Sequence, residues 1–360
     1  MRKTVEGVDA WARRGDFTVQ DIAVFRIVFG AFVLLTLFDV GQVSDSPAAE
    51  FHPPLGPMRF FSEVPPHAAL EALELAAAIL AALLVFGLWT RAVSFVLALA
   101  LMTGFGLTYS FGKIDHTIVL VLVPATMAFS AWGTALTVGM GRDRPDPEAD
   151  SLAIAQWPMR LFALTIALAF VTAGSAKLRS GWLDIHNHAT EGHFIRGYFS
   201  NGRDDWLGPL FLRLHVGPVW ELFDWLTVAL ELGLILAVLT WRSLRIGVAA
   251  AAIFHLGVLL MMNIPFHANV VGYGAFVRWS SFVPMSRWPR ILISRTQGLA
   301  SALVVGTLMY VLHNWVDRLS EIAGIACIFV GAGIGVVYLA VQTAHGLSAL
   351  RRRQQVVTGN

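Results

Sequence analysis

Ten apolar stretches, separated by shorter polar connections, follow one another along this chain. A helix of about 20 apolar residues crosses the hydrocarbon core of a bilayer, so most of these stretches have the length of a membrane span. The eighth is short and contains Asn269, Gly272, Gly274 and Arg278, which makes it the weakest of the set. The pattern predicts an all-α fold, a polytopic transmembrane helical bundle of nine or ten spans. The stretches lie near 21–41, 68–88, 92–111, 115–133, 157–177, 219–240, 244–263, 268–283, 297–314 and 322–343.

The composition agrees with a membrane protein. Of 360 residues, 56% are hydrophobic and only 14% are charged, whereas a soluble domain carries about 25% charged residues. One globule cannot hide this much apolar surface, so lipid must solvate much of the chain. The net charge of +2 gives no reason to expect a nucleic-acid partner. The single cysteine, Cys327, excludes an intrachain disulfide.

Positive charge at the ends of the spans suggests an orientation. If the N-terminus lies in the cytoplasm, ten spans place most arginines of the connections inside, including those of the charged loop 141–150. The outer side then receives segments 42–67 and 178–218, although the second of these carries four arginines. We expect both termini to be cytoplasmic, with the first apolar run kept as a helix rather than removed as a signal peptide.

Ionisable side chains inside the spans are costly in lipid, so each is a functional candidate. The predicted topology brings Lys177, Asp115, His116, Asn263 and His267 to the outer leaflet, from four separate segments. The remaining ionisable residues of this kind are Arg26, Asp39, Glu71, Glu74, Glu221, Asp224, Glu231 and His255.

Each of these residues also has a structural reading. Lys177, at the end of an apolar run, is either an anchor that reaches the water line or a base that takes part in chemistry. His116 either caps the outer end of its helix or assists that chemistry. Glu231 and His255 lie near mid-span, where they either form hydrogen bonds between helices or tune a site. Arg26 is expected to pair with a carboxylate or carbonyl groups as a strut.

Other patterns point to structure. Glu71 and Glu74 share a helix face and lie close enough to the surface to be solvated. Gly331, Gly333 and Gly335 suit close packing of the last span. The chain contains no GxxxxGK[ST], HExxH or GxSxG motif. The segment "HNHATEGH" (186–193) lacks the i, i+4 histidine pairing of a zinc helix and has no cysteine beside it, so we expect no metal.

Five segments of the chain, taken in order, resemble the segments of one known family. They are "FRIVFG" (25–30), "GLWTRAVSFVLALAL" (87–101), "DHTIVL" (115–120), "TAGSAKLRSGWLD" (172–184) and "IFHLGVLLMMNIPFHANVVGY" (253–273). The resemblance is to the membrane part of the vitamin K-dependent gamma-glutamyl carboxylases, whose bacterial form is known as the HTTM domain, and it covers roughly residues 20–290. Arg91 lies at the position of the family's loop arginine, and Asp115 stands where the family usually has asparagine.

The resemblance implies a specific chemistry. In the carboxylases, the lysine at the position of Lys177 is the base that deprotonates reduced vitamin K, and the histidine matching His116 assists. Oxygen then attacks the quinol, and the resulting alkoxide removes a proton from a glutamate side chain. Carbon dioxide captures the carbanion, and the quinol leaves as its epoxide. The resemblance implies Lys177 and His116 as catalytic residues. We expect Asp115, Glu231, His255, Asn263 and His267 to lie around the quinol pocket.

The resemblance also sets the expected organisation and partners. We expect a cytoplasmic segment (1–20), an HTTM-like transmembrane domain (21–290) with Arg26 and Arg91 as structural residues, further C-terminal helices (291–345) and a cytoplasmic tail (346–360). The expected setting is a bacterial inner membrane with the site on the outer side. Expected partners are the bilayer, a reduced naphthoquinone such as menaquinol, oxygen, and carbon dioxide with a peptide glutamate if carboxylation occurs. A non-catalytic quinone- or lipid-binding protein, an accessory subunit and a proton-coupled transporter remain as alternatives.

Overall fold

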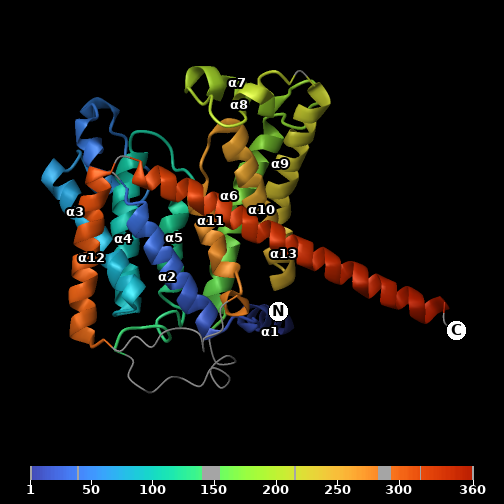
Figure 1. Ribbon diagram of the computed structural model, residues 1–360. Helices are drawn as coiled ribbons and strands as arrows, with labels where there is room; N and C mark the ends of the chain where they lie inside the picture. Colours follow the sequence, from blue (N-terminus) through green and yellow to red (C-terminus); the bar gives the residue numbers. More distant parts are fainter. Residues whose placement is uncertain are drawn as a thin grey trace. The chain divides into compact units, whose positions relative to one another are not determined.

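The structure, a computed structural model, describes residues 2–38, 40–139, 155–214, 216–282, 293–316 and 318–358 (Figure 1). These residues form α-helices and short 3-10 turns, and no strand occurs among them. The all-helical prediction is therefore confirmed for this part of the chain. Asp39 and the charged loop 141–150 lie outside the described residues.

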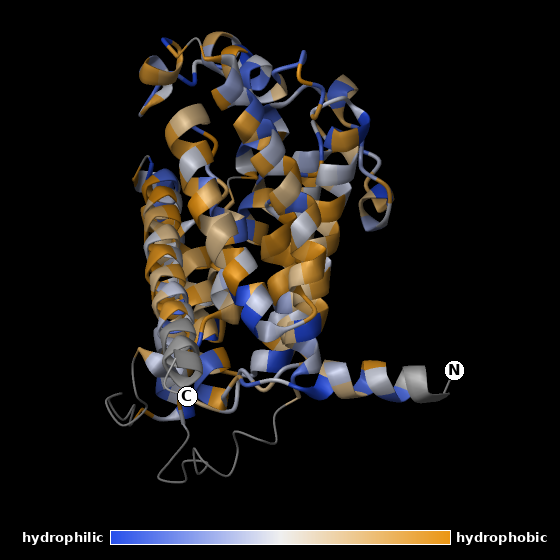
Figure 2. Ribbon diagram, turned by 90° about the vertical axis from the view of Figure 1, so that its right-hand side faces the viewer, coloured by the Kyte–Doolittle hydropathy of each residue, from blue (hydrophilic) through white to orange (hydrophobic). Residues whose placement is uncertain are grey.

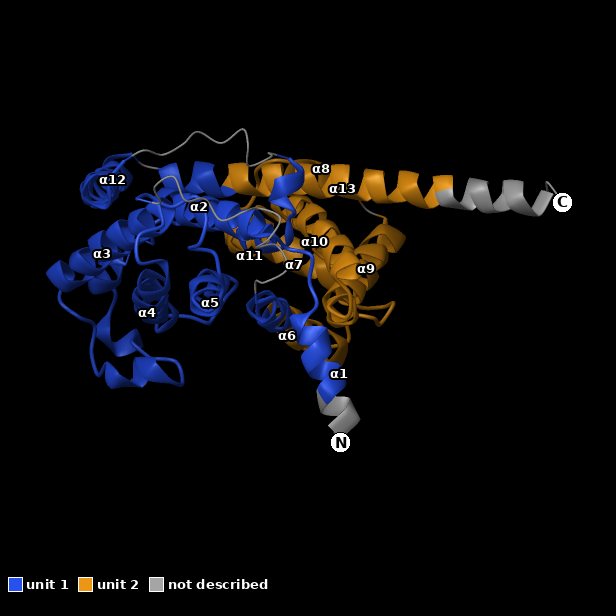
Figure 3. Cartoon of the chain, turned by 90° about the horizontal axis from the view of Figure 1, so that it is seen from below, with its two compact units in different colours: residues 1–165, 271–324 blue, residues 166–270, 325–360 orange. Residues whose placement is uncertain are grey.

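The chain divides into two compact units (Figure 3). Unit 1 consists of Met1–Thr165 and Val271–Gly324, and unit 2 of Ile166–Val270 and Ile325–Asn360. The helices are α1 (Arg2–Arg13), α2 (Val19–Leu35), α3 (His67–Phe86), α4 (Thr90–Tyr109), α5 (Ile118–Met127), α6 (Trp157–Arg179), α7 (Ala189–Ser200), α8 (Gly208–Phe211), α9 (Gly217–Ala237), α10 (Trp241–Met262), α11 (His267–Tyr273), α12 (Arg295–Trp315) and α13 (Leu319–Thr358).

Within unit 1, α3 is the central helix and packs against α2, α4 and α12. The contact with α12 depends on Gly306, because a Cβ there would lie 2.7 Å from the Cα of Ile79. The start of α12 is fixed by a capping box, in which Ser294 and Gln297 each accept a bond from the other's backbone N–H. Small residues and capping groups thus set where these helices begin and how closely they approach.

Arg26 ties α2 to the segment that follows α5. Its fully buried guanidinium donates through Nη1 to the carbonyls of Trp132 (2.7 Å) and Ala135 (3.0 Å), and through Nη2 to that of Leu136 (2.6 Å). Three acceptors offset the cost of burying this charge in unit 1. The sequence suggested either a carboxylate or carbonyl groups as the partners of Arg26, and the structure shows carbonyl groups.

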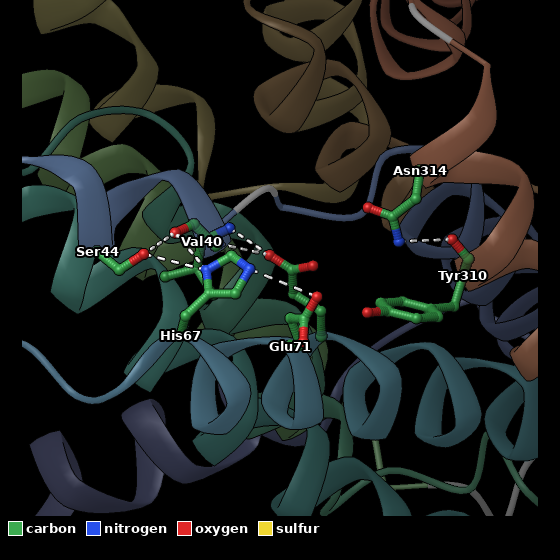
Figure 4. Close-up of polar contacts among 8 residues, drawn as sticks. Val40, Ser44, His67, Glu71, Tyr310 and Asn314 are labelled. Carbon is green, nitrogen blue, oxygen red and sulfur yellow. Dashed lines mark hydrogen bonds and ion pairs between the residues drawn. The ribbon is translucent and has the colours of Figure 1, made fainter.

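Glu74 is buried, contrary to the expectation that it is solvated. Its side chain accepts hydrogen bonds from the backbone N–H groups of Val40 (2.5 Å) and Gly41 (2.9 Å), where the chain continues after α2. Glu71 stays exposed and pairs with His67 at 3.5 Å, and the Tyr310 side chain of α12 extends toward the same cluster (Figure 4). Glu74 is buried because the chain after α2 folds over it and supplies the donors that water would otherwise provide.

In unit 2, α9 packs against α10 and α7, and α8 packs against α10. An aromatic cluster around Phe194 and Trp220, whose rings stack 5.5 Å apart, joins α7 to the first turns of α9. On α13, a Cβ at Gly335 would lie 2.8 Å from the carbonyl oxygen of Ala249 on α10. Gly331 likewise meets Val270, whereas Gly333 has open space, so two of the three glycines serve the predicted close packing.

Six helices in the described part of the chain are long and apolar enough to cross a membrane: α3, α4, α6, α10, α12 and α13. Figure 2 shows the long helices as mainly hydrophobic, with hydrophilic residues gathered at their ends and in α1. Of the other predicted spans, α2 has 17 residues and α9 has 21 residues with three acidic side chains. α5 is short, with 10 residues. The weak eighth stretch forms only the seven-residue α11, about 10 Å long, followed by two 3-10 turns.

Candidate functional site

Lys177 lies in the last turn of α6, where a cation interacts favourably with the helix dipole. The helix ends in a Schellman arrangement: Gly181 has φ 82°, and the N–H of Trp182 donates to the carbonyl of Lys177 at 3.2 Å. Glycine suits this left-handed turn because it has no Cβ. The turn folds the chain back, so that the ring of Trp182 lies 5.1 Å from the Lys177 Nζ.

Gly174 allows α6 to approach α9 at this level. A Cβ at position 174 would lie 2.9 Å from Leu232 Cδ2 and 3.0 Å from Glu231 Cβ. Lys177 is three residues further along α6 and therefore projects from the same side of the helix. The spacing between the glycine and the lysine thus directs the amine toward α9.

The amine forms an ion pair with Glu231, and the Nζ–Oε1 distance is 2.5 Å. The Lys177 side chain is 22% exposed and that of Glu231 10%, so the carboxylate is the deeper group. The second carboxylate oxygen, Oε2, is buried and has no hydrogen-bond partner in the described structure. A carboxylate can accept about four hydrogen bonds, so most of the acceptor capacity of Glu231 is unused.

The aromatic ring above the amine is itself held in place. Trp182 packs against His193 of α7, with ring centroids 5.4 Å apart. A cation near an aromatic face gains stabilisation that does not require water. Lys177 therefore contacts a carboxylate and lies close to an indole ring.

His255 lies on α10, buried among aromatic rings. It stacks on Phe266 at 4.7 Å and packs against Phe170 of α6 at 6.1 Å. Phe170, Gly174 and Lys177 are spaced i, i+4 and i+7, so they follow one face of α6. The structure thus places His255 and the Lys177–Glu231 pair along the same stripe of that helix.

Asn263 and His267 occupy the turn between α10 and α11. Asn263 ends α10 in a left-handed conformation (φ 49°) and donates to Asp205 Oδ2 at 2.7 Å. The carbonyl of His267 lies 4.0 Å from the Cys327 thiol. The side-chain amide of Asn263 thus fastens the end of α10 to the preceding loop, and a part in a quinol pocket stays a prediction for both residues.

Asp115, His116 and Arg91 belong to unit 1. Asp115 is exposed, and its Oδ1 accepts from the N–H (2.8 Å) and hydroxyl (2.7 Å) of Thr117, which leads into α5. His116 is half-buried at the same turn. Arg91 is exposed, with its guanidinium 5.9 Å from the ring centre of Phe129. The joint action of His116 with Lys177 stays a prediction.

The first half of α9 carries two further acids on the same face as Glu231. Asp224 is fully buried and accepts from the N–H groups of Ala189 (3.0 Å) and Thr190 (2.8 Å), which begin α7. Glu221 lies 3.3 Å from the ring nitrogen Nδ1 of His188. No group of three or more His, Cys, Asp or Glu side chains arranged to hold a metal occurs among the described residues.

The pairing of Lys177 with Glu231 was not predicted from the sequence, which placed the lysine at the rim and the glutamate near mid-span beside His255. Gly174 and Trp182 lie in the segment 172–184 that carried the family resemblance, but the sequence pattern did not predict which residues they contact. The i, i+3 spacing of Gly174 and Lys177 could have predicted the contact, because a glycine allows close helix packing on the side of α6 from which the lysine projects.

The described residues form helices and short 3-10 turns, and six of these helices are apolar and long enough to cross a membrane, as in a multi-pass membrane protein. The family model of the HTTM domain matches residues 16–271. The chain therefore belongs to the HTTM-domain family, a membrane protein family related to the vitamin K-dependent carboxylases. No curated protein and no solved structure matches it.

Proposed function

We propose that this protein is a membrane enzyme that activates a reduced naphthoquinone, such as menaquinol, for reaction with oxygen. The observation that supports this most is the position of Lys177, whose amine lies at the end of an apolar helix on a side chain that is only 22% exposed. The HTTM-domain match supports a relation to the vitamin K-dependent carboxylases, and the proposal extends their reaction to this chain. Lys177 is the proposed base in that reaction.

The proposed chemistry needs an apolar and largely dry setting. A lysine accepts a proton only as the neutral amine, and loss of water disfavours the ammonium form. An alkoxide formed after oxygen attack likewise survives only where water is kept away. Side-chain exposures of 22% for Lys177 and 10% for Glu231 fit such a setting. A quinol with a lipid tail reaches such a site from the bilayer.

The other predicted residues have supporting parts in this proposal. His116 assists deprotonation of the quinol, as the resemblance implies, and His255 with its aromatic neighbours forms an apolar wall. Asp115, Asn263 and His267 keep the part in binding the quinol that we expect from the sequence. The acceptor, if carboxylation follows, is a peptide glutamate that captures carbon dioxide.

We further propose nine or ten spans in a bacterial inner membrane, with Lys177 facing the outer side. α2, α9 and the short α5 would join the six apolar helices, which gives nine membrane elements, and α11 would be the tenth. The first turns of α9 carry Glu221 and Asp224 and pack against α7. These turns would therefore extend beyond the hydrocarbon into the outer interface, where the two acids cost less.

Formation of an epoxide tests the proposal. Purified protein, a reduced naphthoquinone and oxygen should yield the quinone epoxide, and Lys177→Ala should lower the rate by about 100-fold or more, the usual contribution of a general base. Lys113→Ala is the matched control, because Lys113 is exposed and belongs to unit 1, whereas Lys177 belongs to unit 2. An absence of epoxide from native protein, under conditions where a known carboxylase forms it, refutes the proposal.

The non-catalytic alternative is favoured by one observation, since an ion pair such as Lys177–Glu231 also serves as a strut between two helices. A quinone- or lipid-binding protein or an accessory subunit would bind naphthoquinone without turnover, and Lys177→Ala would leave that binding nearly unchanged. A proton-coupled transporter would use a pair of titratable groups within the membrane, such as Glu231 and His255. The structure pairs Glu231 with Lys177. Solute uptake that depends on Glu231 but not on Lys177 would support the transporter.

A further inference from the structure

The two members of the buried pair differ in their access to a ligand. Lys177 is the more exposed of the two and lies under the ring of Trp182. Glu231 is nine-tenths buried, and its Oε2 is covered by protein without a hydrogen-bond partner. The amine is therefore the more accessible member of the pair, and the carboxylate is the deeper one.

The contact of 2.5 Å poses a chemical problem for a lysine base. A carboxylate at this distance favours the ammonium form of the lysine, and an ammonium has no lone pair with which to accept a proton. Glu231, however, is poorly suited to a lasting negative charge, because one of its oxygens is buried without a donor. A proton can therefore pass from Lys177 to Glu231 along the existing hydrogen bond.

We propose that Lys177 and Glu231 form a proton-accepting pair, in which Lys177 contacts the hydroxyl group of the substrate and Glu231 receives the proton. This inference rests on the proposed function. Lys177 first transfers a proton to Glu231 and becomes the neutral amine. The O–H bond of the quinol then breaks, and its proton forms a new N–H bond on Lys177. No electron is transferred, and the end state holds a quinolate, an ammonium and a carboxylic acid.

The charges of the site favour this end state. The free pair is neutral overall, whereas the pair with Glu231 protonated carries one positive charge next to the quinolate. Had the carboxylate kept its charge, the anion and Glu231 would share one lysine in an apolar site, which is costly. Glu231 thus acts through Lys177 and is a positioning residue that also stores the proton.

Other titratable groups lie one contact further away. His193 of α7 packs on Trp182, and His255 of α10 packs on Phe170 of α6. Asp224 and Glu221 share the face of α9 on which Glu231 lies. Within the described structure, Lys177 is the charged side chain in contact with Glu231.

The test uses a hydroxynaphthoquinone that is an anion at neutral pH, so that binding imitates the quinolate. Calorimetry in buffers of different ionisation enthalpy measures proton uptake, and infrared difference spectroscopy shows where the proton goes. We expect uptake of about one proton per bound probe, together with a new carboxylic-acid carbonyl band. That band should vanish in Glu231→Gln, shift in Glu231→Asp and persist in the Lys113→Ala control.

The outcomes separate this inference from the proposed function. Binding to native protein without proton uptake, or uptake without a carboxylic-acid band, overturns the proton-accepting pair and leaves a quinone site. A band that persists unchanged in Glu231→Gln also overturns the pair. If that variant does not fold, the native measurements and the shifted band of Glu231→Asp decide the question. No binding by folded native protein overturns the proposed function itself.

Discussion

Replacing Gly174 by alanine should separate the helices that hold the ion pair. An added Cβ would lie 2.9 Å from Leu232 Cδ2 and 3.0 Å from Glu231 Cβ. The leucine methyl is the end of a flexible side chain, but the Cβ of Glu231 is fixed to the backbone of α9, so one helix must shift. Overpacking of this kind costs about 1–3 kcal/mol. The substitution also gains about 0.5–1 kcal/mol of helix propensity, which masks part of that cost.

Gly233→Ala provides the control for helix propensity. Gly233 lies on α9, two residues from Glu231, and a Cβ there meets nothing within 4 Å. Both variants gain the same propensity, so the difference between their free energies of unfolding isolates the contact at Gly174, about 1–3 kcal/mol. Thermal unfolding of the purified protein in detergent should show Gly174→Ala melting a few degrees below Gly233→Ala. Equal melting temperatures would mean that α6 and α9 are not held apart by the Cβ, and the close approach described above would be wrong.

Two further substitutions test contacts described above. Arg26→Met leaves three carbonyls without their donor, which costs about 1–3 kcal/mol for each buried group. The variant should melt well below the control Arg91→Met, because Arg91 is exposed. Equal melting temperatures would refute the strut. Asp224→Ala removes the acceptor for the first N–H groups of α7, which should lower stability by about 0.5–2 kcal/mol. Amide hydrogen exchange should become faster at the start of α7 and stay the same in α10. Unchanged exchange at the start of α7 would contradict the capping role.

Hydropathy predicted the long helices well because their boundaries depend on local chemistry. The predicted span 68–88 corresponds to His67–Phe86, and the span 157–177 to Trp157–Arg179. A continuous apolar run, ended by a glycine or a capping side chain, is sufficient to specify such helices. The eighth stretch was overestimated, because Gly272 and Gly274 lie inside it and the helix ends at Tyr273.

The partners of the buried charges could not be predicted in the same way. Depth was counted from the ends of apolar runs, which placed Glu231 near mid-span and Lys177 at the rim. The first turns of α9 instead pack against α7, so Glu231, fourteen residues after Gly217, comes level with the last turn of α6. Hydropathy gives neither the rotation of a helix about its axis nor its offset along a neighbour. Both depend on close contacts such as the one at Gly174.

The acids of α9 carry a consequence for how this helix can move. Glu221, Asp224 and Glu231 lie within one face of the helix. Glu221 and Asp224 contact His188 and the N–H groups at the start of α7, and Glu231 contacts Lys177 of α6. If α9 moved along its axis by one turn, about 5.4 Å, all three carboxylates would lose their contacts at the same time. Together, the three contacts therefore fix one axial position of α9 and disfavour positions shifted by a turn in either direction.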